Sequence, residues 1–205
     1  MWIMSLTLRG NLEHIADTRK YEKEYFQKIP TGEFKTEVCV VKANDEDCDR
    51  YAVVRLKFND NEISYFEEAM KGIEDLEDLI KRFFGFNVDA GLACICDKKL
   101  HDLYCEFYEK FAKENPDGNI YDDYFAKLFE ESYKDNPKYQ RDGGDWINWN
   151  IPNTNYHLPI FQSGFGDGAY PVYLAYDKDG NVCQLIVELI DIELAYSEID
   201  EDDDE

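Results

Sequence analysis

Four residues have the types and the spacing of a zinc site. Cys94 and Cys96 are two positions apart, so their side chains would share one face of a strand. His101 and Cys105 are four positions apart, so they would share one face of a helix. Together they could complete a Cys₃His tetrahedron. The first pair also lies in an apolar run without a Cys-x₂-Cys knuckle, which favours core thiols with His101 at the surface, and no cofactor is predicted.

A glycine-rich stretch, SGFGDG (163–168), has the composition of a ligand loop. A phosphate loop needs Gly-Lys-Ser/Thr at the start of a helix, whereas a strand-like segment containing Pro171 follows here. Nucleotide binding is therefore not predicted. The glycines would still let another backbone or a ligand approach closely, with the Asp167 side chain left to meet it. We take as candidate binding residues Gly164, Gly166, Asp167 and Gly168.

Aromatic side chains are concentrated in the last third of the chain, where Trp149 and Tyr170 are further binding candidates. Trp146 and Trp149 would face opposite ways in a strand, so at least one of them could be exposed. Such rings anchor protein interfaces well, because they are large and stiff and carry a polar group. Core packing is the alternative use of the same rings.

The segment DKDGN (177–181) and its continuation resemble a calcium loop in part. Four side chains fall at the first, third, fifth and twelfth loop positions: Asp177, Asp179, Asn181 and Glu188. The sixth position, which requires glycine, is Val182. We therefore predict a hairpin turn in which Gly180 has a positive φ and Asp177 caps the turn.

Hydrolytic chemistry would need side chains that converge in space. Ser163, His157 and Asp167 supply the residue types of a catalytic triad, but no Gly-x-Ser-x-Gly elbow is present. Asp89, Asp97 and Asp167 each lie beside a glycine or a strand end, where a carboxylate also forms turns or caps a helix. Two of these carboxylates converging in a cleft would have raised pKa values and could perform acid–base work.

Hydrophobic periodicity predicts the elements that must position these residues. Alternation or short apolar runs predict strands over 36–42, 51–58, 86–97, 146–151, 158–163, 169–176 and 182–190. Apolar stripes at helical spacing predict two helices, over 98–113 and 120–134, capped by Asp97 and Asn119. The order predicts an α+β fold, with an antiparallel or mixed β-sheet and a central helix pair packed on one face.

The charge of the chain limits its partners. The sequence has 22 Lys and Arg against 45 Asp and Glu over 205 residues, a net charge of −23 at pH 7. Such a field repels nucleic acids and anionic membranes and attracts a basic protein. No signal peptide or membrane span is recognised, so a cytoplasmic location is expected. We predict one domain over 1–196 and a disordered acidic tail over 197–205.

Several short patterns resemble a bacterial family of uncharacterised proteins, domain of unknown function 4241 (DUF4241). They are IPTGEFKTEV (29–38), YFEEAM (65–70), FNVDAGLACICD (86–97) and SGFGDGAYPVYLAYDKDGNV (163–182). Their order and spacing agree over nearly the whole chain. The resemblance implies a bacterial, single-domain protein of mixed helix and strand content, and it assigns no reaction to any residue.

These observations favour a non-enzymatic function. The charge, the aromatic residues and the lack of a complete catalytic motif predict a module that binds a basic protein partner. The alternative is a hydrolase that uses Asp89, Asp97 or Asp167, with or without a metal.

Overall fold

Two antiparallel sheets form most of the structure, a computed structural model that describes residues 3–6, 27–30, 32–41, 49–69, 85–88 and 91–196. The four-stranded sheet has the order β1 (Ile3–Leu6), β6 (Leu92–Asp97), β8 (His157–Gln162), β7 (Trp146–Asn150). The six-stranded sheet has the order β2 (Lys35–Val41), β3 (Arg50–Lys57), β10 (Val182–Glu188), β9 (Gly168–Tyr176). The far edge of β9 pairs with both β4 (Tyr65–Glu68) and β5 (Gly85–Val88).

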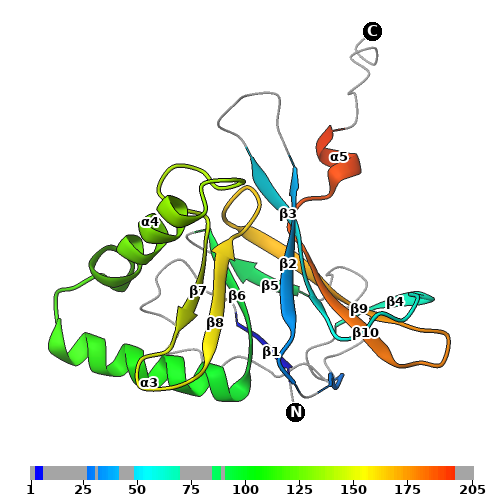
Figure 1. The fold of residues 1–205 in the computed structure, drawn as a ribbon, viewed down its shortest axis with the longest axis horizontal. Helices are drawn as coiled ribbons and strands as arrows, with labels where there is room; N and C mark the ends of the chain where they lie inside the picture. The colour runs from blue at the N-terminus through cyan, green and yellow to red at the C-terminus, as the bar shows by residue number, and fades with distance from the viewer. Residues whose placement is uncertain are drawn as a thin grey trace, which may run out of the picture.

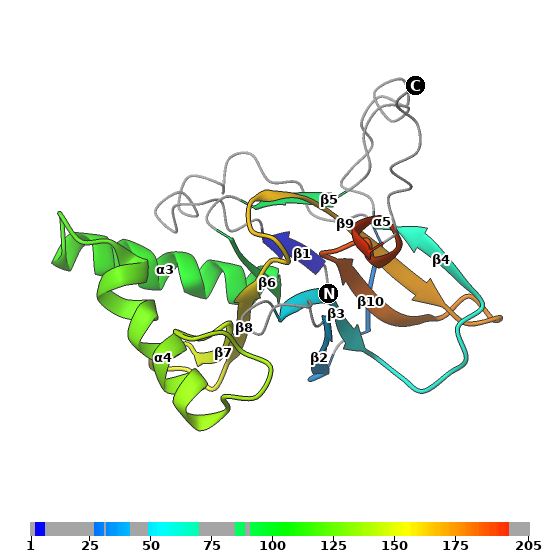
Figure 2. The same cartoon turned by 90° about the horizontal axis from the view of Figure 1, so that it is seen from above.

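A helical layer covers the outer face of the four-stranded sheet (Figures 1 and 2). It consists of α3 (Lys98–Glu114), a π-helical turn η2 (Tyr121–Phe125) and α4 (Ala126–Asp135). The Asn119 side chain caps the second helix by accepting from the N–H groups of Tyr121 and Asp122, at 2.8 and 3.1 Å. A short helix, α5 (Ile192–Tyr196), follows the last strand. The predicted α+β fold, with a helix pair on one face, is confirmed.

Strand β6 is buried on both faces because it lies in the middle layer. Ala93 and Ile95 face the six-stranded sheet and pack in one core with Val54 and Leu174. The alternate residues of β6 face the helices and pack in a second core with Tyr104. The continuous apolar run of LACIC, which lacks a polar face, follows from this position between two apolar layers.

The segment predicted as one strand over 86–97 forms two strands in different sheets. Residues 85–88 form β5, which pairs with β9, and residues 92–97 form β6, which pairs with β1 and β8. Gly91 lies between them with φ of +69°, a conformation that interrupts an extended chain and that glycine adopts without strain. Asp89 lies outside the described residues, as does the predicted acidic tail.

The DKDGN turn joins β9 to β10 as a hairpin, as the sequence predicts. The Asp177 N–H donates to the Asn181 carbonyl oxygen at 3.0 Å, and Gly180 has φ of +79°. The Asp177 carboxylate accepts from the N–H groups of Asp179 and Asn181, at 2.9 and 2.8 Å, and from the Asn61 side chain at 2.7 Å. Asp177 therefore ties the turn to the loop before β4.

Asp177→Asn is expected to make stability less dependent on acid pH. Hydrogen bonds, chiefly from Asn181, lower the pKa of Asp177 to about 2. This value lies below the pKa of an unfolded aspartate, about 3.9, so the ionised carboxylate stabilises the fold fully at a pH above the unfolded pKa. The stabilisation is lost as the pH falls towards 2. Urea denaturation between pH 6 and pH 2 should give a shallower fall for Asp177→Asn than for the exposed Asp179→Asn, and equal slopes would contradict this assignment.

None of the helices in the described ranges has both the length and the apolar character that a membrane crossing requires.

Candidate functional site

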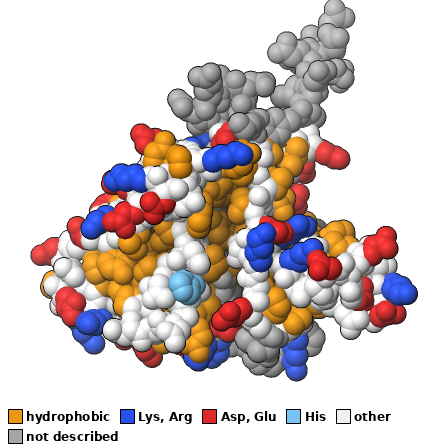
Figure 3. Space-filling model, viewed as in Figure 1, with side chains coloured by type: hydrophobic (Ala, Val, Ile, Leu, Met, Phe, Trp, Pro, Cys, Tyr) orange, Lys and Arg blue, Asp and Glu red, His pale blue; other side chains and the backbone are white. Residues whose placement is uncertain are grey.

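A cleft of about 690 Å³ opens between the two sheets, where β2 faces the strands β6, β7 and β8. Strand β2 is at one edge of the six-stranded sheet and β7 is at one edge of the four-stranded sheet, so both sheets end beside the cleft. Figure 3 shows apolar side chains gathered along this hollow. A mainly apolar cleft of this volume with a few polar groups is the usual form of a ligand-binding site.

The cleft has an apolar floor and an apolar wall from different sheets. Four residues of the middle layer form the floor: Ile95, Trp146, Pro159 and Phe161. The wall comes from β2, the residue before it and the end of β3: Phe34, Thr36, Val38 and Leu56. Phe34 is fixed by edge-to-face contact with Phe58, at 4.8 Å between ring centroids. Val38 remains 36% exposed, so its side chain is open to a ligand.

Polar side chains lie along the rim. Tyr156 is fixed by Lys99, which hydrogen-bonds its hydroxyl group and lies 4.2 Å from the ring centroid. The Nε2 atom of His157 lies 3.2 Å from the amide nitrogen of Asn150, which fixes the imidazole beside the strand. Both Tyr156 and His157 line the cleft. They supply a phenol and an imidazole to a ligand that enters between the sheets.

Asp97 lines the same cleft and also caps α3. Its Oδ1 atom accepts from the Leu100 N–H at 2.9 Å, and its backbone is extended, with φ of −87° and ψ of 170°. The predicted N-cap is therefore confirmed. The other charged residues along the cleft are Glu33 and Lys35, and the Lys35 ammonium pairs with Glu37 at 3.1 Å. Glu33 and Asp97 thus place two carboxylates along the cleft, beside the ammonium of Lys35.

The glycine-rich loop, residues 163–168, is held by the protein itself. A Cβ atom at position 164 would lie 2.6 Å from the Leu189 carbonyl oxygen, so Gly164 allows another backbone to approach. The Tyr170 hydroxyl donates to the carbonyl oxygens of Ser163 and Gly166, at 3.0 and 2.7 Å. Asp167 accepts from the Gly91 N–H at 3.0 Å. The sequence left open whether these glycines allow a backbone or a ligand to approach closely. At Gly164 the structure places a backbone, that of Leu189.

The two described carboxylates of the predicted acid–base site, Asp97 and Asp167, do not come together. Asp167 is bonded to Gly91, immediately before β6, and Asp97 is the last residue of that strand. Six residues of extended chain separate these points by about 20 Å. The triad residues His157 and Ser163 lie at opposite ends of β8, again about 20 Å apart. Asp97 and Asp167 are therefore too far apart to act as a pair, and so are His157 and Ser163.

The candidate zinc ligands lie in the core between α3 and the four-stranded sheet. Cys94, Cys96 and Cys105 are buried there as thiols, and His101 is 3% exposed. The Sγ atom of Cys105 lies 3.6 Å from Nε2 of His101, whose Nδ1 atom lies 3.3 Å from an oxygen of Asp102. Within the described ranges, no three His, Cys, Asp or Glu side chains are grouped to hold a metal ion. The predicted surface location of His101 is wrong, because its face of α3 packs inward.

Trp149, a predicted binding residue, also faces the helices. It is 4% exposed, and its ring lies among those of Phe107, Phe125 and Tyr104. Trp146 faces the opposite way and lines the cleft, as strand alternation predicts. The alternation was therefore correct, and the face of β7 that lines the cleft is the one with Trp146.

Sequence reasoning missed the residues of the cleft wall. The only signal was in β2, where Thr36 and Val38 alternate with the charged side chains of Lys35 and Glu37. That alternation indicates a strand with one polar face. It does not indicate that the other face remains partly uncovered.

A family model described as "Protein of unknown function (DUF4241)" matches residues 12–187. The chain belongs to the DUF4241 family. The match includes the cleft residues described above and the glycine-rich loop. Searches of curated proteins and of solved structures gave no match.

Proposed function

We propose that the protein is a non-enzymatic binding module that takes an extended, basic and apolar segment of a partner protein into the cleft between its sheets. The observation that carries the proposal is the cleft itself, with its volume of about 690 Å³ and its apolar floor and wall. An extended segment places alternate side chains on opposite sides, so one set would contact the apolar floor. Trp146 and Phe161 supply the large apolar surfaces for that set.

The charge of the protein supports a basic partner. Glu33 and Asp97 lie along the cleft, and the whole chain has a net charge of −23. Lys or Arg side chains at the rim of a bound segment would meet carboxylates, while the surrounding field would accelerate its approach. Binding should therefore weaken as salt increases.

The hydrolase alternative has less support from the geometry. Of its two described carboxylates, only Asp97 lines the cleft, and the Asp97 side chain already caps α3. Asp167 is bonded at the other end of β6. A single carboxylate in a helix cap does not provide the acid and base pair of a hydrolase.

Val38→Lys should weaken binding of a basic apolar peptide about tenfold, because it places a cation on the cleft wall. A suitable probe is a labelled peptide of alternating valine and lysine, measured by fluorescence anisotropy at low and high salt. Cys39→Lys is the matched control, since Cys39 is exposed, adjacent in β2 and not part of the cleft. It adds the same charge and should leave the affinity nearly unchanged.

Two results would contradict the proposal. Equal weakening by Val38→Lys and Cys39→Lys would show that the peptide responds to overall charge and not to the cleft. Equally tight binding of a peptide of alternating valine and glutamate would remove the basis for a basic partner.

A further inference from the structure

Strand β2 has one paired edge and one outer edge. Within the described ranges, β2 pairs with β3 alone, so the sheet ends at its other side. An edge strand presents unpaired N–H and C=O groups that can pair with another strand. The hydrogen bonds of β3 determine which residues of β2 present those groups.

The even-numbered residues of β3 and its extension bond to β10. The Phe58 N–H donates to Cys183 at 2.8 Å, and the Ala52 carbonyl accepts from Leu189 at 2.7 Å. Backbone groups alternate sides along an antiparallel strand, so the odd-numbered residues of β3 direct theirs to β2. Those odd residues are the ones opposite Lys35, Glu37 and Cys39.

It follows that Lys35, Glu37 and Cys39 direct their backbone groups inward, to β3. The intervening residues, Thr36 and Val38, direct theirs to the outer edge. Phe34 continues the same alternation. The side chains of Phe34, Thr36 and Val38 line the cleft, and Val38 is 36% exposed. The outer edge of β2 therefore combines available backbone groups with uncovered apolar surface.

This edge is complementary to itself. We propose that two copies of the chain associate through antiparallel pairing of their β2 strands about Thr36, which joins their six-stranded sheets into one. In that register Thr36 faces Thr36 of the partner subunit as a hydrogen-bonded pair. Phe34 faces Val38 of the partner subunit. The backbone groups of both residues are directed to the outer edge, so this pair is hydrogen-bonded as well. The contact has the two-fold symmetry that is commonest among homodimers.

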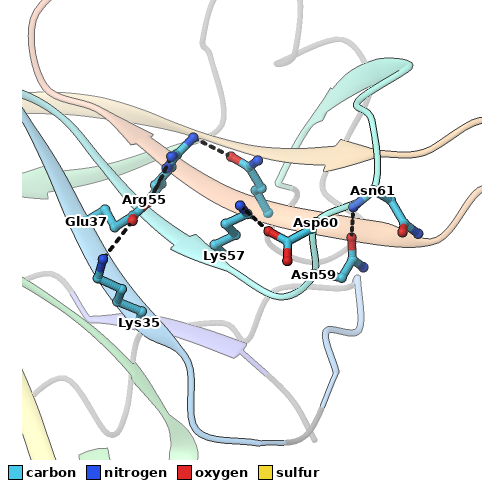
Figure 4. Close-up of polar contacts among 8 residues, drawn as sticks. Lys35, Glu37, Arg55, Lys57, Asn59, Asp60 and Asn61 are labelled. Atoms are coloured by element: carbon cyan, nitrogen blue, oxygen red, sulfur yellow. Dashed lines mark hydrogen bonds and ion pairs between the residues drawn. The ribbon is translucent and has the colours of Figure 1, made fainter.

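The charged face of β2 fits the same register. Lys35 is opposite Glu37 of the partner subunit, and Glu37 is opposite Lys35 of the partner subunit. Within one chain the Lys35 and Glu37 side chains already lie together on this face, 3.1 Å apart, and Arg55 bonds the Glu37 carboxylate at 2.8 Å (Figure 4). These two cations lower the pKa of Glu37, which keeps it ionised. Two opposite-charge cross-strand pairs thus flank the central threonines.

The test is a charge exchange in the full chain, followed by sedimentation equilibrium over a range of concentrations. The wild-type chain should form a dimer. Lys35→Glu alone sets carboxylate against carboxylate in both cross-strand pairs, and Glu37→Lys alone sets ammonium against ammonium, so each variant should dimerise about tenfold or more weakly. In an equimolar mixture the two variants can form a heterodimer, in which both cross-strand pairs set a carboxylate against an ammonium. The mixture should therefore dimerise more tightly than either variant alone. Lys178→Glu, in the β9–β10 turn, is the control for net charge and should dimerise like the wild type.

Thr36→Pro provides a second test that does not depend on charge. The Thr36 N–H is directed away from β3, so proline at this position removes no hydrogen bond of the β2–β3 ladder. The variant should remain folded by circular dichroism and become monomeric. A wild-type chain that is monomeric at all concentrations would overturn the inference. So would a folded Thr36→Pro dimer, or a mixture of the charge variants that associates no better than each variant alone. These outcomes are independent of peptide binding in the cleft.

Discussion

Gly144→Ala is expected to destabilise the protein by at least about 4 kcal/mol, an exceptional loss for one methyl group. Gly144 has φ of +93°, and a Cβ atom there would lie 2.2 Å from the carbonyl oxygen of Phe129. Phe129 is fully buried in α4, so its backbone has no room to retreat. The loop that returns the chain from α4 to β7 can pass only where position 144 has no side chain. Urea denaturation followed by circular dichroism measures the change.

The adjacent glycine is a matched control. Gly143 has nearly the same conformation, with φ of +91°, but its Cβ position has no atom of the described residues within 4 Å apart from its own chain neighbours. Gly143→Ala should therefore cost only the backbone strain, about 1–3 kcal/mol. Equal losses for the two variants would mean that α4 does not press against the loop at position 144.

Local signals in the sequence were sufficient to predict the two central helices and the residues that cap them. Asp97 and Asn119 were identified as caps because a helix start needs an acceptor for its first N–H groups, and both side chains accept them in the structure. The DKDGN turn is local in the same sense, since Asp177 and Gly180 act within five residues. Such features require no knowledge of which strands pair.

Features that depend on long-range pairing were not predicted. Residues 86–97 form one apolar pattern, but β5 and β6 pair with strands from different sheets. Asp97 and Asp167 were grouped by residue type, and only the antiparallel order places them at opposite ends of β6. The cleft likewise depends on β2 lying across from β7 and β8. No spacing within a single segment encodes that arrangement.

Trp149→Ala is expected to cost about 3–5 kcal/mol, because it empties the centre of the core between the helices and the four-stranded sheet. The indole ring lies 4.9 Å from Phe107 and 5.1 Å from Phe125 between ring centroids, and both contacts are edge-to-face. Its Nε1–H donates to the Tyr124 hydroxyl at 3.3 Å, which joins β7 to η2. Thermal and urea unfolding should both show the loss.

Comparison of Trp146→Ala with Trp149→Ala tests the two faces of β7 independently. Trp146 is half-buried and lines the cleft, so its removal should cost less stability than that of Trp149 and should weaken binding of the valine–lysine peptide. The sequence alone made Trp149 the binding candidate, whereas in the structure Trp149 is buried and Trp146 lines the cleft. A stable Trp149→Ala protein that lost peptide binding would return Trp149 to the binding surface. An unstable Trp149→Ala protein beside a stable Trp146→Ala protein with weakened binding would support the assignment of the cleft face to ligand contact.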